Sequence, residues 1–543
     1  MAEKTHHFIL GAKEKEAQNT NQIDLSMKVF QPVLISILVL ASLFPAVHVY
    51  SCTVLIAGKN TTEDGSILFV KTEDDGGMQM DYLWRFPRKN YQQGAFLQAN
   101  LQGLKIPQRD ETYSYWLDEC PPTHYSNMVI NEWGVAFGSN GCQSKEDPVE
   151  VLEERDQIED GGIGFMLRII LAQRAKTARQ AVLMAADLID RYGYRASGRN
   201  LNIVGPEEAW QLQMARGKHY VARRVRDDEV AVVSNTFSIR EVDLNDRDNF
   251  IASPDLIDYA IERGWYDPEI DGDFDFAEAY ATSDAHEANS NNHRQWIMAR
   301  VLNPGFPVSL EEAELGRMPV SVEPAQKIGL RDVMDILRNH YEGTKLDKSE
   351  GHRYSPHHSP HTICRYSTHK STVVQQRSDM PTAIGTVVWR ALGQPCQSVF
   401  VPWYLGTQSF PGVYTRKDYK RTGKSKTELL DDEATNAAFA AYHFNYPFWK
   451  HRETDVKTAS GVFHALGKMV DAHYADNHQI VREAFDRMEN HAIRMQPRIE
   501  KEAQRLYQED PEKALEYLTD YTHYYALEAY EKAKALSLRL MNQ

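Results

Sequence analysis

A cysteine lies shortly after the most apolar segment of the chain. Residues 33–47 (VLISILVLASLFPAV) are almost wholly apolar, and Cys52 follows five residues later. If export removed this segment and cleavage fell directly before Cys52, its free α-amine would lie within reach of its own thiol. An amine with a reference pKa of about 8 can accept the thiol proton, and the thiolate is the nucleophilic form. The spacing therefore predicts nucleophilic catalysis by an N-terminal cysteine, with coincidence or lipidation as alternatives.

The length of the apolar segment indicates a signal peptide. Fifteen residues fall short of the roughly 20 that a membrane-spanning helix needs. Lys28 precedes the segment, and Ser51 fits a cleavage site. We expect residues 27–51 to be a signal peptide, residues 1–26 an upstream or non-native extension, and the mature protein to be exported to the periplasm or secreted. An uncleaved anchor is one alternative, and a lipoprotein, which Tyr50 fits poorly, is another.

The composition is that of a large globular protein. The chain has 543 residues, of which 42% are hydrophobic, and 61 Lys plus Arg against 76 Asp plus Glu give a net charge of −15. This charge argues against a nucleic-acid partner. In an oxidising compartment the four cysteines other than Cys52 have three possible disulfide connectivities, and the alternative is that they are buried small hydrophobic residues. These four are Cys120, Cys142, Cys364 and Cys396.

A histidine-rich segment is the one candidate for a metal site. Its residues are His352, His357, His358 and His361, with Cys364 nearby. Prolines and serines interrupt the cluster, and structural zinc sites favour tighter paired spacings. The sequence favours a solvated loop, and we expect neither a metal nor a cofactor. The G-x-S-x-G, P-loop, H-E-x-x-H and C-x-x-C motifs are absent.

Hydrophobic patterning predicts a layered α+β fold with antiparallel sheets. Two hairpins are expected, at residues 53–57 with 66–71 and at residues 127–131 with 135–138. Two helices follow at 164–175 and 177–192, and strands are expected at 201–204, 209–215, 220–225, 230–234, 384–391 and 398–402. A catalytic domain would span residues 52–430. The helical C-terminal region, 431–543, would pack on it or form an appended domain, and Asp510 with Pro511 opens one of its helices.

Several sequence blocks together resemble one enzyme family. Cys52 opens a hairpin that ends in KTED at residues 71–74. Further blocks are NEWGVA at 131–136, DDEVAVVSN at 227–235, RNHYEGT at 338–344, the strand at 385–391 and VPWY at 401–404. Their order resembles the N-terminal-nucleophile cysteine hydrolases of the dipeptidase A type, distant relatives of the choloylglycine hydrolases and penicillin V acylases.

The resemblance implies an αββα sandwich and a dipeptidase mechanism. Cys52 would attack the amide carbonyl, its α-amine would relay the proton, and water would hydrolyse the resulting thioester. The site residues that the resemblance implies are Cys52, Lys71, Asp74, Asn140, Asn235 and Arg294.

The resemblance also suggests a role for each partner of Cys52. Asp74 matches the acid that binds the terminal amine; its alternative is a solvated carboxylate. Lys71 stands where the relatives usually have arginine, so it offers a point charge and no planar fork. Asn235 and, more loosely, Asn140 match positions beside the oxyanion, and either fits a turn residue as well. Arg294 resembles a distal active-site arginine; its alternative is a surface arginine on a helix.

The resemblance implies dipeptide substrates with broad side-chain tolerance. The acidic cluster at residues 73–75 could attract the substrate amine, and Lys71 or Arg294 its carboxylate. One alternative is an acyl-amide hydrolase acting on conjugated bile acids or N-acyl amino acids, and another is an inactive exported binding protein. The expected partners are a dipeptide or small amide substrate and signal peptidase, with no nucleic acid; a homo-oligomer is left open.

Overall fold

A computed structural model describes residues 52–74, 81–100, 102–119, 128–351, 353–359, 361–415 and 457–542. They belong to one compact unit, Tyr50–Gln543. The predicted extension, the predicted signal peptide and the predicted domain boundary at residue 430 lie outside the described residues. Within these ranges, no helix is both long and apolar enough to cross a membrane.

The first sheet has seven antiparallel strands in the order β16-β14-β1-β2-β17-β18-β19. The hairpin predicted after Cys52 lies at its centre, where Val54 pairs with Lys71. The sequence pattern missed β17, which pairs with β2 along nearly its whole length. The strands are β1 (Val54–Ala57), β2 (Ile67–Asp74), β14 (Val230–Val233), β16 (Ser321–Val322), β17 (Thr368–Gln376), β18 (Thr386–Leu392) and β19 (Val401–Tyr404).

The second sheet has eight antiparallel strands in the order β15-β13-β12-β11-β10-β9-β8-β3. It contains the second predicted hairpin, β9 and β10, and the strands predicted at 201–204, 209–215 and 220–225, whereas those predicted at 230–234, 384–391 and 398–402 overlap strands of the first sheet. The strands are β3 (Tyr82–Phe86), β8 (Tyr115–Glu119), β9 (Met128–Asn131), β10 (Ala136–Gly141), β11 (Tyr194–Val204), β12 (Ala209–Gly217), β13 (Tyr220–Val225) and β15 (Phe250–Ala252). Two small ribbons pair β4 (Lys89–Asn90) with β7 (Glu111–Thr112) and β5 (Phe96–Gln98) with β6 (Lys105–Pro107).

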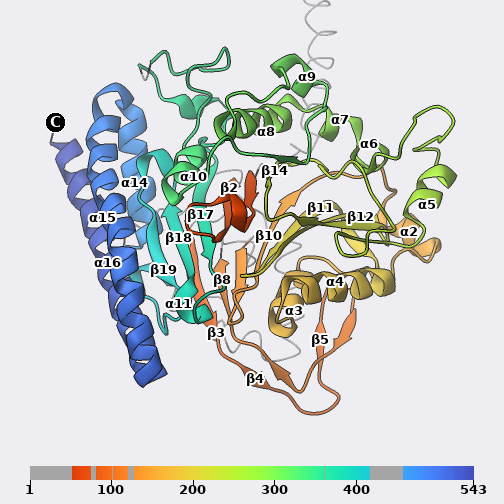
Figure 1. Ribbon diagram of the computed structural model, residues 1–543, viewed down its shortest axis with the longest axis horizontal. Helices are drawn as coiled ribbons and strands as arrows, with labels where there is room; N and C mark the ends of the chain where they lie inside the picture. Colours follow the sequence, from red (N-terminus) through yellow and green to blue (C-terminus); the bar gives the residue numbers. More distant parts are fainter. Residues whose placement is uncertain are drawn as a thin grey trace, which may run out of the picture. The chain divides into compact units, whose positions relative to one another are not determined.

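Helices cover the outer face of each sheet, which confirms the predicted αββα arrangement (Figure 1). One apolar core joins the two sheets; for example, it contains Val70 of β2 and Ile130 of β9. A second core joins the eight-stranded sheet to α3 (Met166–Arg174) and α4 (Ala178–Tyr192). On the other side, α10 (Leu330–Leu337), α14 (Ala459–Ala472), α15 (Tyr474–Glu509) and α16 (Pro511–Met541) pack on the seven-stranded sheet.

Short helices fill the connections between these layers. The α-helices are α2 (Val149–Glu154), α5 (Leu256–Glu262), α6 (Phe276–Tyr280), α7 (Ser283–His286), α8 (Asn289–Leu302), α9 (Leu310–Glu314) and α11 (Thr382–Gly385). The 3₁₀ turns are η1 (Lys59–Thr61), η2 (Pro356–His358), η3 (Pro395–Gln397) and η4 (Gly412–Tyr414). Among them, α8 contributes a residue to the candidate active site.

Helix α4 shows how local sequence sets an element's ends. The Thr177 side chain caps the helix by accepting a hydrogen bond from the Gln180 amide at 3.1 Å. The Gln180 side chain accepts from Lys176 and not from Thr177, so the capping box is only half formed. Gly193 ends the helix with φ of 70°, and a Cβ there would lie 2.1 Å from the Gln157 carbonyl oxygen.

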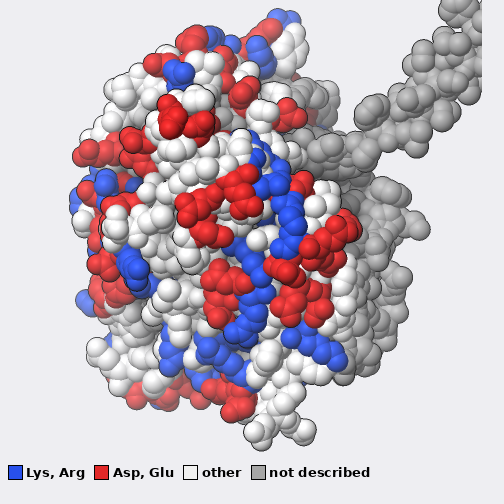
Figure 2. Space-filling view, turned by 90° about the vertical axis from the view of Figure 1, so that its right-hand side faces the viewer, with Lys and Arg blue, Asp and Glu red and all other residues white. Residues whose placement is uncertain are grey.

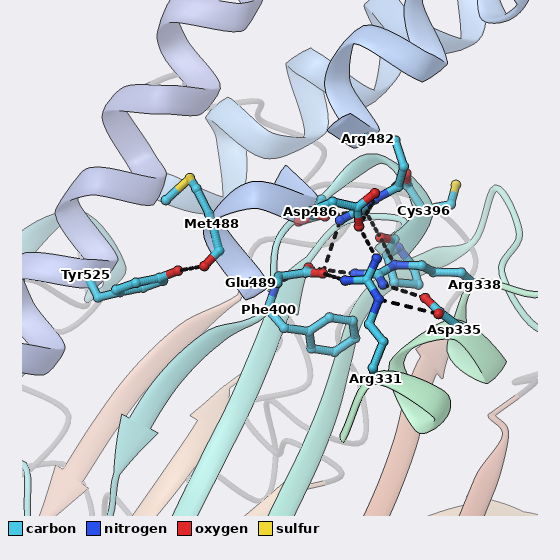
Figure 3. A network of polar contacts seen from close by, with 12 residues as sticks. Arg331, Asp335, Arg338, Cys396, Phe400, Arg482, Asp486, Met488, Glu489 and Tyr525 are labelled. Atoms are coloured by element: carbon cyan, nitrogen blue, oxygen red, sulfur yellow. Dashed lines mark hydrogen bonds and ion pairs between the residues drawn. The ribbon is translucent and has the colours of Figure 1, made fainter. Parts of the chain in front are cut away.

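A buried carboxylate fastens α15 to the core. Glu489 is fully buried and accepts hydrogen bonds from Arg338 at 2.6 Å, from Arg331 at 2.8 Å and from the Phe400 amide at 2.9 Å (Figure 3). Arg482 also contacts it, at 3.2 Å. The ion pairs and hydrogen bonds offset the desolvation free energy of these buried charges. The C-terminal helices therefore pack on the core, which decides between the two arrangements expected for them.

Charges are mixed on the side of the unit where α5 lies. Figure 2 shows Lys and Arg interleaved with Asp and Glu over that face. One such group is Asp147, which pairs with Arg155 and, at 2.8 Å, with Arg263. The net charge of −15 is therefore not gathered into a single acidic surface on this face.

Candidate active site

The β1–β2 hairpin places Cys52 at the centre of the fold. Thr53 and Thr72 are joined by two hydrogen bonds, from the Thr53 amide to Thr72 Oγ1 at 3.0 Å and from the Thr72 amide to the Thr53 carbonyl at 2.9 Å. Cys52 comes two residues before β1 and is 2% exposed. Its thiol therefore sits in a buried position fixed by sheet pairing.

Alternate residues of β2 carry charges toward the thiol. Lys71 and Glu73 share one face of the strand because side chains alternate along it. Cys52 Sγ donates to Glu73 Oε1 at 3.5 Å, and Lys71 Nζ donates to Glu73 Oε2 at 2.9 Å. Lys71 also donates to the Thr72 carbonyl at 3.0 Å. A thiol, a carboxylate and an ammonium thus form one contiguous group.

The surroundings of Cys52 favour the protonated thiol over the thiolate. Burial and, after it, the charge of Glu73 raise the pKa of the Cys52 thiol to about 11, although Lys71 acts in the opposite direction. Burial alone would lower the pKa of Lys71, but the charges at Cys52 and Glu73 outweigh it and raise that pKa. The ammonium therefore stays charged, while the thiol needs a base to become a nucleophile.

Asp74 lies on the other face of β2 and is buried. Its carboxylate accepts hydrogen bonds from Thr368 Oγ1 at 2.5 Å and Thr72 Oγ1 at 3.3 Å, and Arg365 approaches it to 3.5 Å. Burial raises the pKa of Asp74 even though Arg365 and Thr368 lower it. The alternative of a solvated carboxylate is therefore wrong.

Arg294, on α8, binds the main chain of Cys52. It is 0% exposed and donates to the Cys52 carbonyl at 2.7 Å, to Thr53 Oγ1 at 2.9 Å and to Asn235 Oδ1 at 3.0 Å. Burial, and then the neighbouring charge of Arg365, lower the pKa of Arg294 to about 9. The alternative of a surface arginine is wrong.

Both predicted asparagines also lie at this site. Asn140 lies within β10 and not in a turn, and its Nδ2 donates to the carbonyls of Cys52 and Ser234, both at 3.1 Å. Asn235 lies just after β14 and donates to the Gly141 carbonyl at 3.0 Å. The two N–H groups of Asn140 are both used on carbonyls, so this residue holds the Cys52 main chain. Asn235 uses one N–H in this way.

The structure brings all six predicted site residues together and adds three more: Glu73, Thr368 and Arg365. Strand alternation could have identified Glu73, because it stands two residues after Lys71 on an expected strand. Thr368 and Arg365 come from β17 and the loop before it, and a sequence pattern that misses this strand cannot align them with Asp74.

The histidine-rich segment departs from its prediction. His357 and Cys364 are buried, at 2% and 0% exposure, so the solvated-loop interpretation is wrong for them, whereas His361 is exposed. His352 lies outside the described residues. Cys142, Cys364 and Cys396 are buried and form no disulfide, as the alternative of buried small residues predicts, and Cys120 lies outside the described residues.

Comparison with known proteins assigns the chain to a family. The model of peptidase family C69 matches residues 51–450. The protein belongs to peptidase family C69. This membership makes it a peptide-bond hydrolase, as the sequence predicted, and its matched region starts one residue before Cys52.

Relatives of this C69 peptidase carry dipeptidase names. A "Probable dipeptidase" of Salmonella dublin is 28% identical over 369 residues, which is 67% of this chain and 83% of that protein. A "Probable dipeptidase" of Latilactobacillus sakei is 24% identical and covers 82% of this chain and 92% of its own length. Among solved structures, a C2A mutant of the conjugated bile acid hydrolase from Clostridium perfringens matches with a TM-score of 0.30 and 11% identity, over 63% of this chain and 89% of that one.

Proposed function

We propose that this C69 peptidase is an exported dipeptidase whose nucleophile is Cys52 at the mature N-terminus. The observation that carries the proposal is a pair of hydrogen bonds to the Cys52 main chain: Arg294 and Asn140 both donate to its carbonyl, at 2.7 and 3.1 Å. These hydrogen bonds orient Cys52 through its carbonyl and do not involve its main-chain nitrogen, which becomes the α-amine. The names of the relatives support the substrate class.

Removal of the residues before Cys52 supplies the missing base. The new α-amine has a reference pKa of about 8, so near neutral pH a useful fraction of it is unprotonated. The amine accepts the thiol proton, and Asp74, on the neighbouring strand, accepts a hydrogen bond from the amine and orients it. Lys71 stabilises the thiolate as it forms, since it is the cation whose charge lowers the pKa of Cys52.

The thiolate attacks the carbonyl carbon of the scissile peptide bond. The carbonyl oxygen becomes an oxyanion, to which the remaining N–H of Asn235 donates in this mechanism. Arg294 binds Oδ1 of Asn235 at 3.0 Å and so limits the orientation of its amide. The intermediate collapses to a thioester and the C–N bond breaks. The Cys52 ammonium returns its proton to the leaving amine. Water, deprotonated by the same amine, then hydrolyses the thioester.

The substrate carboxylate needs a cation other than the two expected. Lys71 is paired with Glu73, and Arg294 is fully buried with its donors engaged. Arg199 is a half-buried alternative: it lies opposite Gly141 in the β10–β11 pairing, it interacts electrostatically with Cys52, and its Nε donates to the Tyr194 hydroxyl at 3.2 Å. An Arg199→Gln variant should raise KM for dipeptides by about tenfold or more, the cost of one charge-assisted hydrogen bond. Dipeptide amides, which lack the carboxylate, should be hydrolysed equally by both forms.

A substrate panel tests the activity. Mature enzyme is assayed with dipeptides, conjugated bile acids and N-acyl amino acids, with Cys52→Ser as the control. Hydrolysis of dipeptides alone, lost in the variant, is the expected result. Preference for bile-acid or acyl conjugates would support the acyl-amide hydrolase instead, and no difference between wild type and variant on any substrate would support the inactive binding protein. Fractionation of the producing cells tests export, because a mature form found only in the cytoplasm contradicts it.

A further inference from the structure

Four ligand-type side chains meet in a second cluster within the core. His340, His357, Cys364 and Cys396 are all buried, at 3%, 2%, 0% and 3% exposure. One nitrogen or sulfur atom from each lies within 4.8 Å of all the others. His340 follows α10, His357 lies in η2, Cys364 precedes β17 and Cys396 lies in η3. Four separate segments thus converge on one point.

Four of the six distances between these atoms lie close to the edges of a tetrahedron around a zinc ion, and the other two are no longer than 4.8 Å. His340 Nε2 and His357 Nε2 are 3.3 Å apart, and the two sulfurs are 3.6 Å apart. His357 Nε2 lies 3.2 Å from Cys396 Sγ and 3.4 Å from Cys364 Sγ. Zinc bonds of about 2.0 Å to nitrogen and about 2.3 Å to sulfur give tetrahedral edges of roughly 3.3 Å for N–N, 3.5 Å for N–S and 3.8 Å for S–S.

The outer nitrogens of both histidines are bound to carboxylates. His340 Nδ1 lies 2.8 Å from Glu342 Oε1, and His357 Nδ1 lies 2.7 Å from Asp471 Oδ1. A proton on each Nδ1 satisfies these contacts and leaves both Nε2 lone pairs directed at each other across 3.3 Å. A cation bound between them would satisfy both acceptors. Carboxylates behind metal-binding histidines are the usual supporting arrangement.

We propose that His340, His357, Cys364 and Cys396 bind one structural Zn²⁺ ion. Two thiolates neutralise the charge of the ion, which makes its burial favourable, and thiolate with imidazole is the ligand set that selects zinc. All four positions are filled by protein, so the site is a closed structural one and does not take part in peptide hydrolysis.

The zinc site joins the active-site sheet to the C-terminal helices. Asp471, behind His357, belongs to α14. Arg482 of α15 donates to the carbonyls of Pro395 and Cys396, at 3.2 and 3.4 Å, and so fixes η3 from the other side (Figure 3). Cys364 directly precedes Arg365, which contacts Asp74. The ion therefore holds the loop that places Arg365 beside the catalytic carboxylate.

Metal analysis of the purified full-length protein tests the proposal. We expect about one Zn²⁺ per chain after exhaustive dialysis, from one set of four ligands. Cys52→Ala and Cys142→Ser should keep the ion, whereas Cys364→Ser and Cys396→Ser should each lose most of it. Folded wild-type protein without zinc, or the same zinc content in all four variants, would overturn the proposal.

A second measurement needs no variant to fold. Growth in Co²⁺ in place of Zn²⁺ should give the strong visible absorption of tetrahedral cobalt with sulfur-to-metal charge transfer. Peptide mapping without reduction should find Cys364 and Cys396 unlinked, because a disulfide would shorten their 3.6 Å separation to about 2.05 Å. A disulfide between them, or cobalt protein without this spectrum, would refute zinc binding.

Discussion

Replacing Glu73 by glutamine should make the Cys52 thiol more acidic. Glu73 Oε1 accepts from Cys52 Sγ at 3.5 Å, and its other oxygen binds Lys71. The carboxylate therefore repels the thiolate and at the same time holds the ammonium that would stabilise it. Glu73→Gln keeps the shape, removes the negative charge and leaves the thiolate as the nearest anion to Lys71.

The size of the effect follows from this separation. Two unit charges 3.5 Å apart interact by about 5 kcal/mol at an effective dielectric constant of ~20. This corresponds to about 3.5 pKa units as an upper value. Starting from a pKa of about 11, we expect the Cys52 pKa to fall by at least about one unit after relaxation of the neighbours. Lys71→Met is the matched control and should change the pKa in the opposite direction.

The assay is the pH dependence of alkylation at Cys52. Iodoacetamide reacts with the thiolate, and mass spectrometry of the peptide containing Cys52 separates its modification from that of the other cysteines. The midpoint of the rate against pH should fall in Glu73→Gln and rise in Lys71→Met, measured on the same processed form. An unchanged or higher midpoint in Glu73→Gln would show that this carboxylate does not control the thiol.

Three further predictions follow from the buried contacts. Thr368→Val removes the 2.5 Å hydrogen bond that lowers the pKa of Asp74 and should therefore raise that pKa further. Activity that needs the ionised carboxylate is lost as pH falls, so the acid limb of kcat/KM should move to higher pH, and an unmoved limb argues against a role for Asp74. Glu489→Gln leaves arginines facing an uncharged partner and should cost about 3 to 5 kcal/mol in urea unfolding; a change below about 1 kcal/mol would contradict the buried network. Cys52→Ser should lower kcat/KM by about a thousandfold or more, and Lys71→Arg by about tenfold, since only the first removes the nucleophile. Equal losses would contradict the assignment of Cys52 as the nucleophile.

The hairpins, α3, α4 and the start of α16 could be predicted from the sequence because their signals are local. Short apolar, β-branched runs on either side of a polar turn mark β1 and β2, and Thr177 and Gly193 mark the ends of α4. β17 was not predicted because it is buried along its whole length yet rich in polar residues. Its sequence therefore lacks the alternation of a half-exposed strand. Contacts with residues far away in the sequence decide whether such a segment forms a strand.

The order of the sequence blocks was enough to predict which residues form the candidate site. It was not enough to predict the contacts between them. Nothing near Arg294 in the sequence indicates that it is buried against the Cys52 carbonyl, because that contact spans 242 positions. The zinc cluster was seen only in part: His357 and Cys364 lie in the histidine-rich segment, whereas His340 is 17 residues from His357 and Cys396 is 32 residues from Cys364. Ligands so far apart have no recognisable spacing, and only the fold brings them together.

The mature N-terminus is the most direct test of Cys52 as nucleophile. Active enzyme is isolated from its producing cells and its first peptide is analysed by mass spectrometry, before and after brief incubation with a dipeptide-derived thiol-reactive inhibitor. We predict that the chain begins at Cys52 with a free α-amine and that the inhibitor is found on its sulfur. Fully active enzyme that keeps residues before Cys52, or that carries an acylated Cys52 amine, would contradict the mechanism.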